Sequence, residues 1–193
     1  GGGLSVATAG AGVTISNCTF SGNVAGPGTG STTSGGGMSV DFENGISTPV
    51  STINISNTTF DSNTATAPTT SSFGGAMSSR ALGSIVNLDQ CTITNNQSNG
   101  LTSADSGGYA GGLYNQDANF TISNSLITGN HATTFAGGGR SLNVNNSTTT
   151  TNTTITNTTI SGNNAENAGG WMSIGNSTQN LNTTVIASTI SGN

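Results

Sequence analysis

The stretch Ile53-Asn-Ile-Ser-Asn-Thr-Thr-Phe60-Asp-Ser-Asn63 decides the fold, because its pattern returns along the whole chain. Apolar residues alternate with polar ones up to Ile55, as in a strand that buries one face. The alternation breaks at Asn57 and then resumes. Asparagine tolerates the left-handed backbone conformation better than other non-glycine residues. We therefore predict two strands that are joined by a tight bend at Asn57.

Two short motifs alternate strictly along the sequence. One is Phe/Ile-x-x-Asn, found at Phe20/Asn23, Phe60/Asn63, Ile93/Asn96, Ile127/Asn130, Ile160/Asn163 and Ile190/Asn193. The other is Gly-Gly-x-φ-Ser/Asn, where φ is usually large and apolar, at Gly1–Ser5, Gly35–Ser39, Gly74–Ser78, Gly111–Asn115, Gly137–Ser141 and Gly169–Ser173. A period of this length predicts a solenoid, in which stacked units bury one continuous core.

We therefore expect an all-β fold, a right-handed parallel β-helix of about six coils that start near residues 1, 35, 74, 111, 137 and 169. The right hand follows from the strong preference of parallel crossovers. The chain reads as a single β-helix segment over residues 1–193, with corner loops of variable length. Side chains of one column should lie one strand spacing apart, ~4.8 Å.

Asparagines should form two structural columns in such a stack. One column lies at the bend and contains Asn17, Asn57, Asn124 and Asn157. The other closes the second motif and contains Asn23, Asn63, Asn96, Asn130, Asn163 and Asn193. Side-chain amides at one strand spacing can bond to one another along the axis, as they do in stacked cross-β ladders.

The composition excludes two classes of partner. Charged residues make up 5% of the chain, the pI is near 4.1, and the only cations besides His131 are Arg80 and Arg140. Nucleic-acid binding requires Lys and Arg to displace phosphate counterions, so we expect no nucleic-acid partner. No apolar run approaches 18 residues, so we expect no membrane span in this segment. A signal peptide, if one exists, should lie upstream of Gly1.

The pairing of Gly-Gly-Ala/Gly-φ with Phe-x-x-Asn resembles the polymorphic outer membrane protein repeats of bacterial surface adhesins, which are right-handed parallel β-helices. The resemblance covers essentially the whole chain, although Ile replaces Phe after the second coil and Arg140 takes a φ position. It implies an extracellular or cell-surface location and a structural or adhesive role in a fibre or filament. Surface glycans would then be the partners.

Two cysteines fall in one small inward column of the predicted coils. Cys18 and Cys91 lie in the first and third coils, with Thr58 between them. Two strand spacings separate their Cα atoms by ~9–10 Å, more than the ~7 Å that a disulfide bond tolerates. We therefore predict two buried free thiols that pack as small apolar residues.

Charged residues also fall in register. Counting from the first Gly of each coil places Arg80 between Asp41 and Asp117 on neighbouring coils. A surface ion-pair ladder is a better interpretation than a carboxylate cluster, because a central Arg repels a metal ion. His131 has no evident partner. We expect no catalytic residue, no metal site and no cofactor, and thus not an enzyme.

Two alternative functions compete with the fibre. A polysaccharide-active β-helix enzyme would need several carboxylates in one groove. An ice- or glycan-binding module would need a flat face, and outward Thr/Ser pairs provide one at Thr19/Ser21, Thr92/Thr94, Thr159/Ser161 and Thr189/Ser191. Asp61 and Leu126 interrupt this face.

Sugar attachment and surface contact each have candidate residues. Asn145, Asn146 and Asn176 lie in predicted loops and begin Asn-x-Ser/Thr sequons, which makes them candidate glycosylation sites. Trp171 either projects toward a glycan or a neighbouring subunit or, as we favour, packs over the gap left by Gly139. Phe73, Tyr109 and Phe135 should stack along one corner.

Neither end of the repeat has the polar cap that a solenoid requires for solubility on its own. Open β-edges invite head-to-tail pairing, which propagates as a filament unless it closes. We therefore expect self-association end to end, or continuation of the same chain into a longer fibre.

Overall fold

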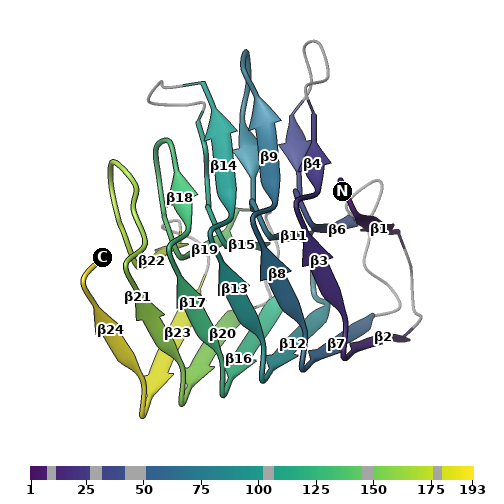
Figure 1. Ribbon diagram of the computed structural model, residues 1–193. Helices are drawn as coiled ribbons and strands as arrows, with labels where there is room; N and C mark the ends of the chain where they lie inside the picture. Colours follow the sequence, from purple (N-terminus) through teal and green to yellow (C-terminus); the bar gives the residue numbers. More distant parts are fainter. Residues whose placement is uncertain (8–11, 27–31, 42–50, 102–106, 145–149, 176–179) are drawn as a thin grey trace.

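A computed structural model describes residues 1–7, 12–26, 32–41, 51–101, 107–144, 150–175 and 180–193. These residues form 24 strands, and none of them is helical. Every pair of strands that is hydrogen-bonded within a sheet runs parallel, with partners one repeat apart in the sequence, for example β7 with β12. The chain is thus a parallel β-solenoid, as predicted, with coils stacked side by side along one axis (Figure 1).

Three sheets contain six strands each, one from every repeat. Sheet 1 consists of β1 (Leu4–Val6), β6 (Met38–Asp41), β11 (Met77–Arg80), β15 (Leu113–Gln116), β19 (Gly139–Asn143) and β22 (Trp171–Gly175). Sheet 2 consists of β2 (Gly12–Ser16), β7 (Thr52–Ser56), β12 (Ile85–Asp89), β16 (Asn119–Ser123), β20 (Thr151–Thr156) and β23 (Leu181–Ile186). Sheet 3 consists of β3 (Thr19–Ser21), β8 (Thr59–Asp61), β13 (Thr92–Thr94), β17 (Leu126–Thr128), β21 (Thr159–Ser161) and β24 (Thr189–Ser191).

Two smaller sheets extend the coils away from sheet 3, toward the top of Figure 1. One consists of β4 (Val24–Ala25), β9 (Thr64–Ala67), β14 (Gln97–Gly100) and β18 (His131–Ala132). The other pairs β5 (Thr33–Ser34) with β10 (Ser72–Phe73). The longer insertions that follow sheet 3 in the first three coils are thus accommodated at a corner, while the three main sheets keep their register.

The bend between sheets 2 and 3 has the backbone conformation that its asparagines predict. The φ angle is positive at Asn17 (55°), Asn57 (45°), Asn124 (50°) and Asn157 (47°). Gln90 (54°) and Ala187 (47°) take the same conformation without its usual residue. A second corner, just before the final Asn of each repeat, also has positive φ, at Gly22, Ser62, Asn95, Gly129, Gly162 and Gly192.

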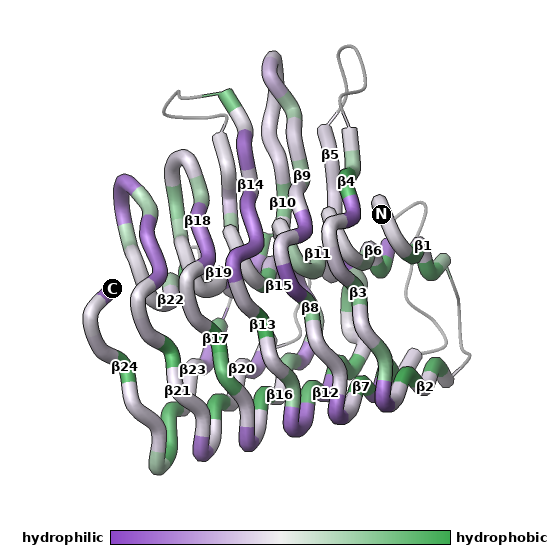
Figure 2. The backbone as a smooth tube through the Cα atoms, viewed as in Figure 1, coloured by the Kyte–Doolittle hydropathy of each residue, from purple (hydrophilic) through white to green (hydrophobic). Residues whose placement is uncertain are grey.

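The core is a set of side-chain columns between the three main sheets. Phe20 and Phe60 stack with ring centroids 4.9 Å apart, and the column continues through Ile93, Ile127, Ile160 and Ile190. Sheet 2 contributes inward residues such as Ile55 and Leu88, which are at most 1% exposed. Hydrophobic residues, green in Figure 2, recur along the strands of sheets 2 and 3 from coil to coil. Each such side chain contributes about 1.5–3 kcal/mol when fully buried.

The alignment of the Gly-Gly motif predicted for the last three coils is wrong by one residue. Met77 pairs with Leu113, Leu113 with Gly139, and Gly139 with Trp171. Tyr114, Arg140 and Met172 therefore lie beside Ser78, on the opposite face of sheet 1.

The reason for this shift lies in the first glycine of the motif. Gly74 has a positive φ of 62°, and its carbonyl accepts a hydrogen bond from Gly36 N–H. In the later coils an alanine takes that place, since Ala110, Ala136 and Ala168 accept the equivalent bonds. Their Gly-Gly pairs thus correspond to the second and third residues of the earlier motifs.

Candidate functional site

The most regular polar feature of the molecule is a ladder of six asparagines, which we call the Asn ladder. In each rung the Oδ1 atom of one asparagine accepts hydrogen bonds from both the backbone N–H and the Nδ2 of the asparagine one coil earlier, at 2.9–3.1 Å. Its members are Asn23, Asn63, Asn96, Asn130, Asn163 and Asn193.

From Asn63 onward, each Nδ2 group also donates to a backbone carbonyl of the preceding coil. Asn63 donates to the carbonyl of Phe20 and Asn96 to that of Phe60, both at 2.9 Å. Asn130, Asn163 and Asn193 make the equivalent bonds. The central amides are fully buried and their hydrogen-bonding capacity is met, which buried polar groups require. The ladder also has a direction, because the Oδ1 acceptor of every amide–amide bond belongs to the asparagine of the later coil.

The bend column forms a second, interrupted set of amide bonds. Nδ2 of Asn57 donates to Oδ1 of Asn17 at 2.6 Å, and Nδ2 of Asn157 donates to Oδ1 of Asn124 at 2.7 Å. Gln90 occupies the third bend, and Asn124 bonds instead to Oδ1 of Asp89 at 2.7 Å. These residues are exposed or at the surface, so the fixed backbone bend matters more here than the side-chain bonds.

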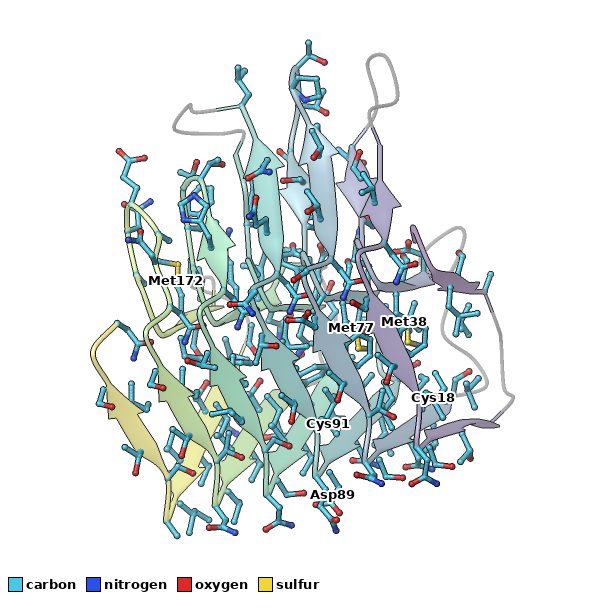
Figure 3. All side chains as sticks on the ribbon, viewed as in Figure 1. Cys18, Met38, Met77, Asp89, Cys91 and Met172 are labelled. Atoms are coloured by element: carbon cyan, nitrogen blue, oxygen red, sulfur yellow. The ribbon has the colours of Figure 1, made fainter. Side chains whose placement is uncertain are left out.

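The cysteines are both free, as predicted. Their column continues from Cys91 to Ser125, Thr158 and Ser188 through hydrogen bonds from each backbone N–H to the next hydroxyl. Cys91 is 1% exposed, and burial raises the pKa of its thiol. Cys18 is exposed, so its predicted burial is wrong. Cys18 lies in the first coil (Figure 3), and no described residue of the column covers it on that side.

Trp171 packs against the core over the glycine of the preceding coil. A Cβ atom at Gly139 would lie 2.2 Å from the Trp171 ring. The indole thus occupies the volume that Leu113 and Met77 fill in their own coils. Its Nε1 atom is buried and makes no hydrogen bond. Trp171 thus packs over the gap left by Gly139, as the sequence favoured, and does not project away from the coil.

The predicted ladder of Asp41, Arg80 and Asp117 is half wrong. Arg80 pairs in register with Asp41 on one side, but with Gln116 on the other. Asp117 is 3% exposed, and its Oδ1 accepts a hydrogen bond from the backbone N–H of Val144 at 2.9 Å. The one-residue shift of the later Gly-Gly motifs is the cause of this error.

Both arginines lie against a column of aromatic rings beside sheet 1. Phe73, Tyr109 and Phe135 stack with centroids 4.7 and 4.6 Å apart. The guanidinium carbon of Arg140 lies 4.6 Å from the Tyr109 ring centroid and 4.4 Å from that of Phe135, and Arg80 lies 5.3 Å from Phe73. Cation–π contacts of this kind stabilise desolvated cations. Burial lowers the pKa of Arg140 and raises that of neighbouring Tyr114.

Sequence reasoning recognised the aromatic column but missed its arginines. It placed Arg140 at an apolar inward position, whereas Arg140 is 5% exposed on the other face of sheet 1. The available signal was spacing, because Arg140 follows Phe135 as Tyr114 follows Tyr109.

The outward face of sheet 3 is mostly hydroxylated. Thr19, Thr59, Thr92, Thr159 and Thr189 lie in one register column, which Leu126 interrupts. In the second column Asp61 accepts hydrogen bonds from Thr94 and Asn95, and these bonds lower the pKa of its carboxyl. The described part of sheet 3 therefore presents a mostly polar outer face, to which each strand contributes two side chains.

Asn145, Asn146 and Asn176 lie outside the described residues. His131 is exposed in β18. Within the ranges that the structure describes, no three His, Cys, Asp or Glu side chains gather closely enough to hold a metal ion. In the same ranges no helix is long and apolar enough to cross a membrane.

Comparison with known proteins adds no relative. No protein-family model matches the chain, and neither a curated protein nor a solved structure matches it significantly.

Proposed function

We propose that this chain is a segment of an extracellular or cell-surface structural fibre with an adhesive role, and that it is not an enzyme. The Asn ladder is the observation that carries the proposal. A buried and fully hydrogen-bonded amide column fills the interior with groups that bond along the solenoid axis. The same bond can repeat in any number of further coils, as a fibre requires.

Location and adhesion draw on separate support. The repeat resembles those of bacterial surface adhesins, and charged residues make up only 5% of the chain. Sequon asparagines Asn145, Asn146 and Asn176 are candidate glycan carriers, and a sugar at any of them would place the chain in a secretory route. Surface glycans of a host or neighbouring cell are the proposed adhesive partners.

Immunogold labelling of the source cells tests this proposal. Antibodies against residues 1–193 should label intact, unpermeabilised cells along thin filaments. Label that appears only after permeabilisation would refute the surface fibre. Mass spectrometry of the protein purified from those cells tests the three candidate glycan sites in the same experiment.

A second candidate function is supported by the outward face of sheet 3. Its threonine column repeats at one strand spacing, ~4.8 Å, which suits an ordered ligand such as ice or a regular polysaccharide. The substitutions Thr92→Lys and Thr159→Lys would project two cations from this face. If the face binds, thermal hysteresis or glycan-array signals present in the parent chain should disappear in this variant.

A further inference from the structure

We propose that Arg140 and the aromatic rings around it bind a negatively charged group, a carboxylate or a sulfate, of an acidic surface glycan. The inference rests on the proposed adhesive role and names the chemistry of its partner. The site, which we call the Arg140 site, consists of Arg140, Tyr109, Phe135 and Tyr114 on the outer side of sheet 1.

Arg140 is a buried cation with no carboxylate partner among the described residues. It is 5% exposed, and its Nε and Nη1 atoms are buried without a hydrogen bond. In the part of the chain that the structure describes, the charges that act on its pKa belong to Tyr114 and Tyr109, and none belongs to an acid. Removing an ion from water is strongly unfavourable unless an opposite charge compensates. A buried polar group left unpaired in this way often marks the place of a bound ion or water.

The aromatic rings hold the guanidinium in place without neutralising it. The guanidinium carbon lies 4.6 Å from the Tyr109 ring centroid and 4.4 Å from that of Phe135, and the two rings stack with centroids 4.6 Å apart. Contact with aromatic rings offsets part of the desolvation of a cation but leaves its charge unpaired. A guanidinium fixed in this way loses little freedom when an anion docks on its exposed edge. The site is therefore preorganised.

The local electrostatic field favours an anion at this place. Tyr114 lies beside Arg140 in sheet 1 and is 1% exposed. Both arginines act to lower the pKa of Tyr114, and each does so more strongly than Asp117 acts to raise it. The cluster is therefore positive, although the net charge of the chain is -5. A positive site in an otherwise acidic chain attracts a negatively charged ligand.

Arg80 provides an internal comparison. Its guanidinium carbon lies 5.3 Å from the Phe73 ring centroid, but the side chain is exposed and lies beside Asp41 in register. Removing Arg80 changes the net charge of the chain as much as removing Arg140 does. Only the loss of Arg140 removes a buried, unpaired cation, so the two substitutions separate a specific site from general charge attraction.

The experiment is surface plasmon resonance of residues 1–193 over immobilised polygalacturonate, which carries carboxylates, dextran sulfate, which carries sulfates, and neutral dextran. We expect binding to one or both anionic polymers and none to dextran. Arg140→Gln should lower the affinity at least about tenfold, the effect of losing one charge-assisted hydrogen bond. Arg140→Lys should lower it nearly as much, because a compact ammonium does not lie flat against two rings. Arg80→Gln should change it much less.

A second measurement reports on the site without any variant. Tyr109 and Tyr114 are the only tyrosines of the chain, and both lie beside Arg140. A soluble fragment of the polymer that binds should therefore change the tyrosine band in the near-ultraviolet circular dichroism of the parent chain. The far-ultraviolet spectrum of Arg140→Gln, if it matches that of the parent chain, shows that this variant is folded.

The outcomes separate the Arg140 site from the surface fibre. Equal losses of affinity in Arg140→Gln and Arg80→Gln would overturn the site, since binding would then depend on net charge alone. Binding that leaves the tyrosine band unchanged would place the glycan elsewhere and would overturn it as well. A chain that binds neither anionic polymer would overturn the site, while the surface fibre would still be judged by immunogold labelling. The preferred polymer identifies the anionic group as carboxylate or sulfate.

Discussion

The Oδ1 atom of Asn96 lies 2.9 Å from both the backbone nitrogen and the Nδ2 atom of Asn63, one coil earlier. One side-chain atom thus satisfies two buried donors and fixes the spacing of two coils. Asn96 then repeats the arrangement toward Asn130. The ladder therefore satisfies buried polar groups and also sets the register between neighbouring coils.

Removing one rung should weaken the whole stack. Asn96→Ala removes the acceptor of two buried N–H groups of Asn63. Each orphaned group costs about 1–3 kcal/mol, so we expect a loss of about 2–6 kcal/mol in the free energy of unfolding. Chemical denaturation followed by circular dichroism measures it. Gln97→Ala, one residue along on an exposed side chain, is the matched control and should change the midpoint little. Equal midpoints for the two variants would contradict the ladder's role.

The contact between Gly139 and Trp171 predicts a pair of coupled substitutions. Gly139→Ala places a Cβ atom 2.2 Å from the indole, so the ring must move, at a cost of about 1–3 kcal/mol. Since Trp171 is the only tryptophan, its fluorescence emission should shift to longer wavelength.

Two further variants control this prediction. Gly12→Ala should have no such effect, because its Cβ atom would meet only the Thr52 carbonyl at 3.9 Å. Adding Trp171→Ala to Gly139→Ala should remove most of the cost of the alanine. Additive costs in this double-mutant cycle would show that the two residues do not interact.

Replacing Gln90 with asparagine should stabilise the fold. It holds a φ of 54° at a bend where Asn stands in the neighbouring coils, and Asn adopts this conformation more readily. We expect Gln90→Asn to raise the free energy of unfolding by about 0.5–1 kcal/mol. Gln90→Val should lower it, because a β-branched residue is least tolerant of positive φ. The order Asn above Gln above Val in denaturation midpoints is the test, and any other order would contradict the bend assignment.

The two thiols should react at very different rates. Cys18 is exposed, whereas Cys91 is 1% exposed and burial raises its pKa, which reduces its reactive thiolate. A thiol reagent at pH 8 should therefore label one cysteine per native chain in dilute solution and the second only in denaturant. Cys18→Ser should lose the fast phase. Rapid labelling of both sites in the native protein would be incompatible with the buried column.

Asp61 and Asp89 should make the fold less stable in acid. Hydrogen bonds from Thr94 and Asn95 lower the pKa of Asp61, and bonds from Ser123 and Asn124 lower that of Asp89, from an ordinary 3.8. A carboxyl with a lowered folded-state pKa stabilises the fold above its unfolded pKa, and this stabilisation is lost as pH falls through the folded value. The denaturant concentration at the unfolding midpoint should therefore decrease as the pH is lowered below about 4.

The effect should be small, because both carboxyls are near the surface and screened by water. The double variant Asp61→Asn, Asp89→Asn should flatten the pH dependence. A midpoint that falls equally steeply in the variant would assign the acid sensitivity to other groups.

The sequence by itself determined the parallel solenoid, the positive-φ bends and the columns of Phe20 and Asn23, because period-two burial and the left-handed tolerance of Asn are local properties repeated six times. Cys18 and Cys91 could be predicted as unpaired for the same reason, since one column fixes their separation.

Only the tertiary structure decided where Arg140 and Asp117 lie. Ala136 can replace the first glycine of the motif, so that counting glycines misplaces the register by one residue, and a one-residue slip turns each side chain to the opposite face. The exposure of Cys18 likewise depends on which coils stack upon the first. The register of sheet 1 and the exposure of Cys18 both depend on the packing of one repeat against another, which the sequence of a single repeat does not specify.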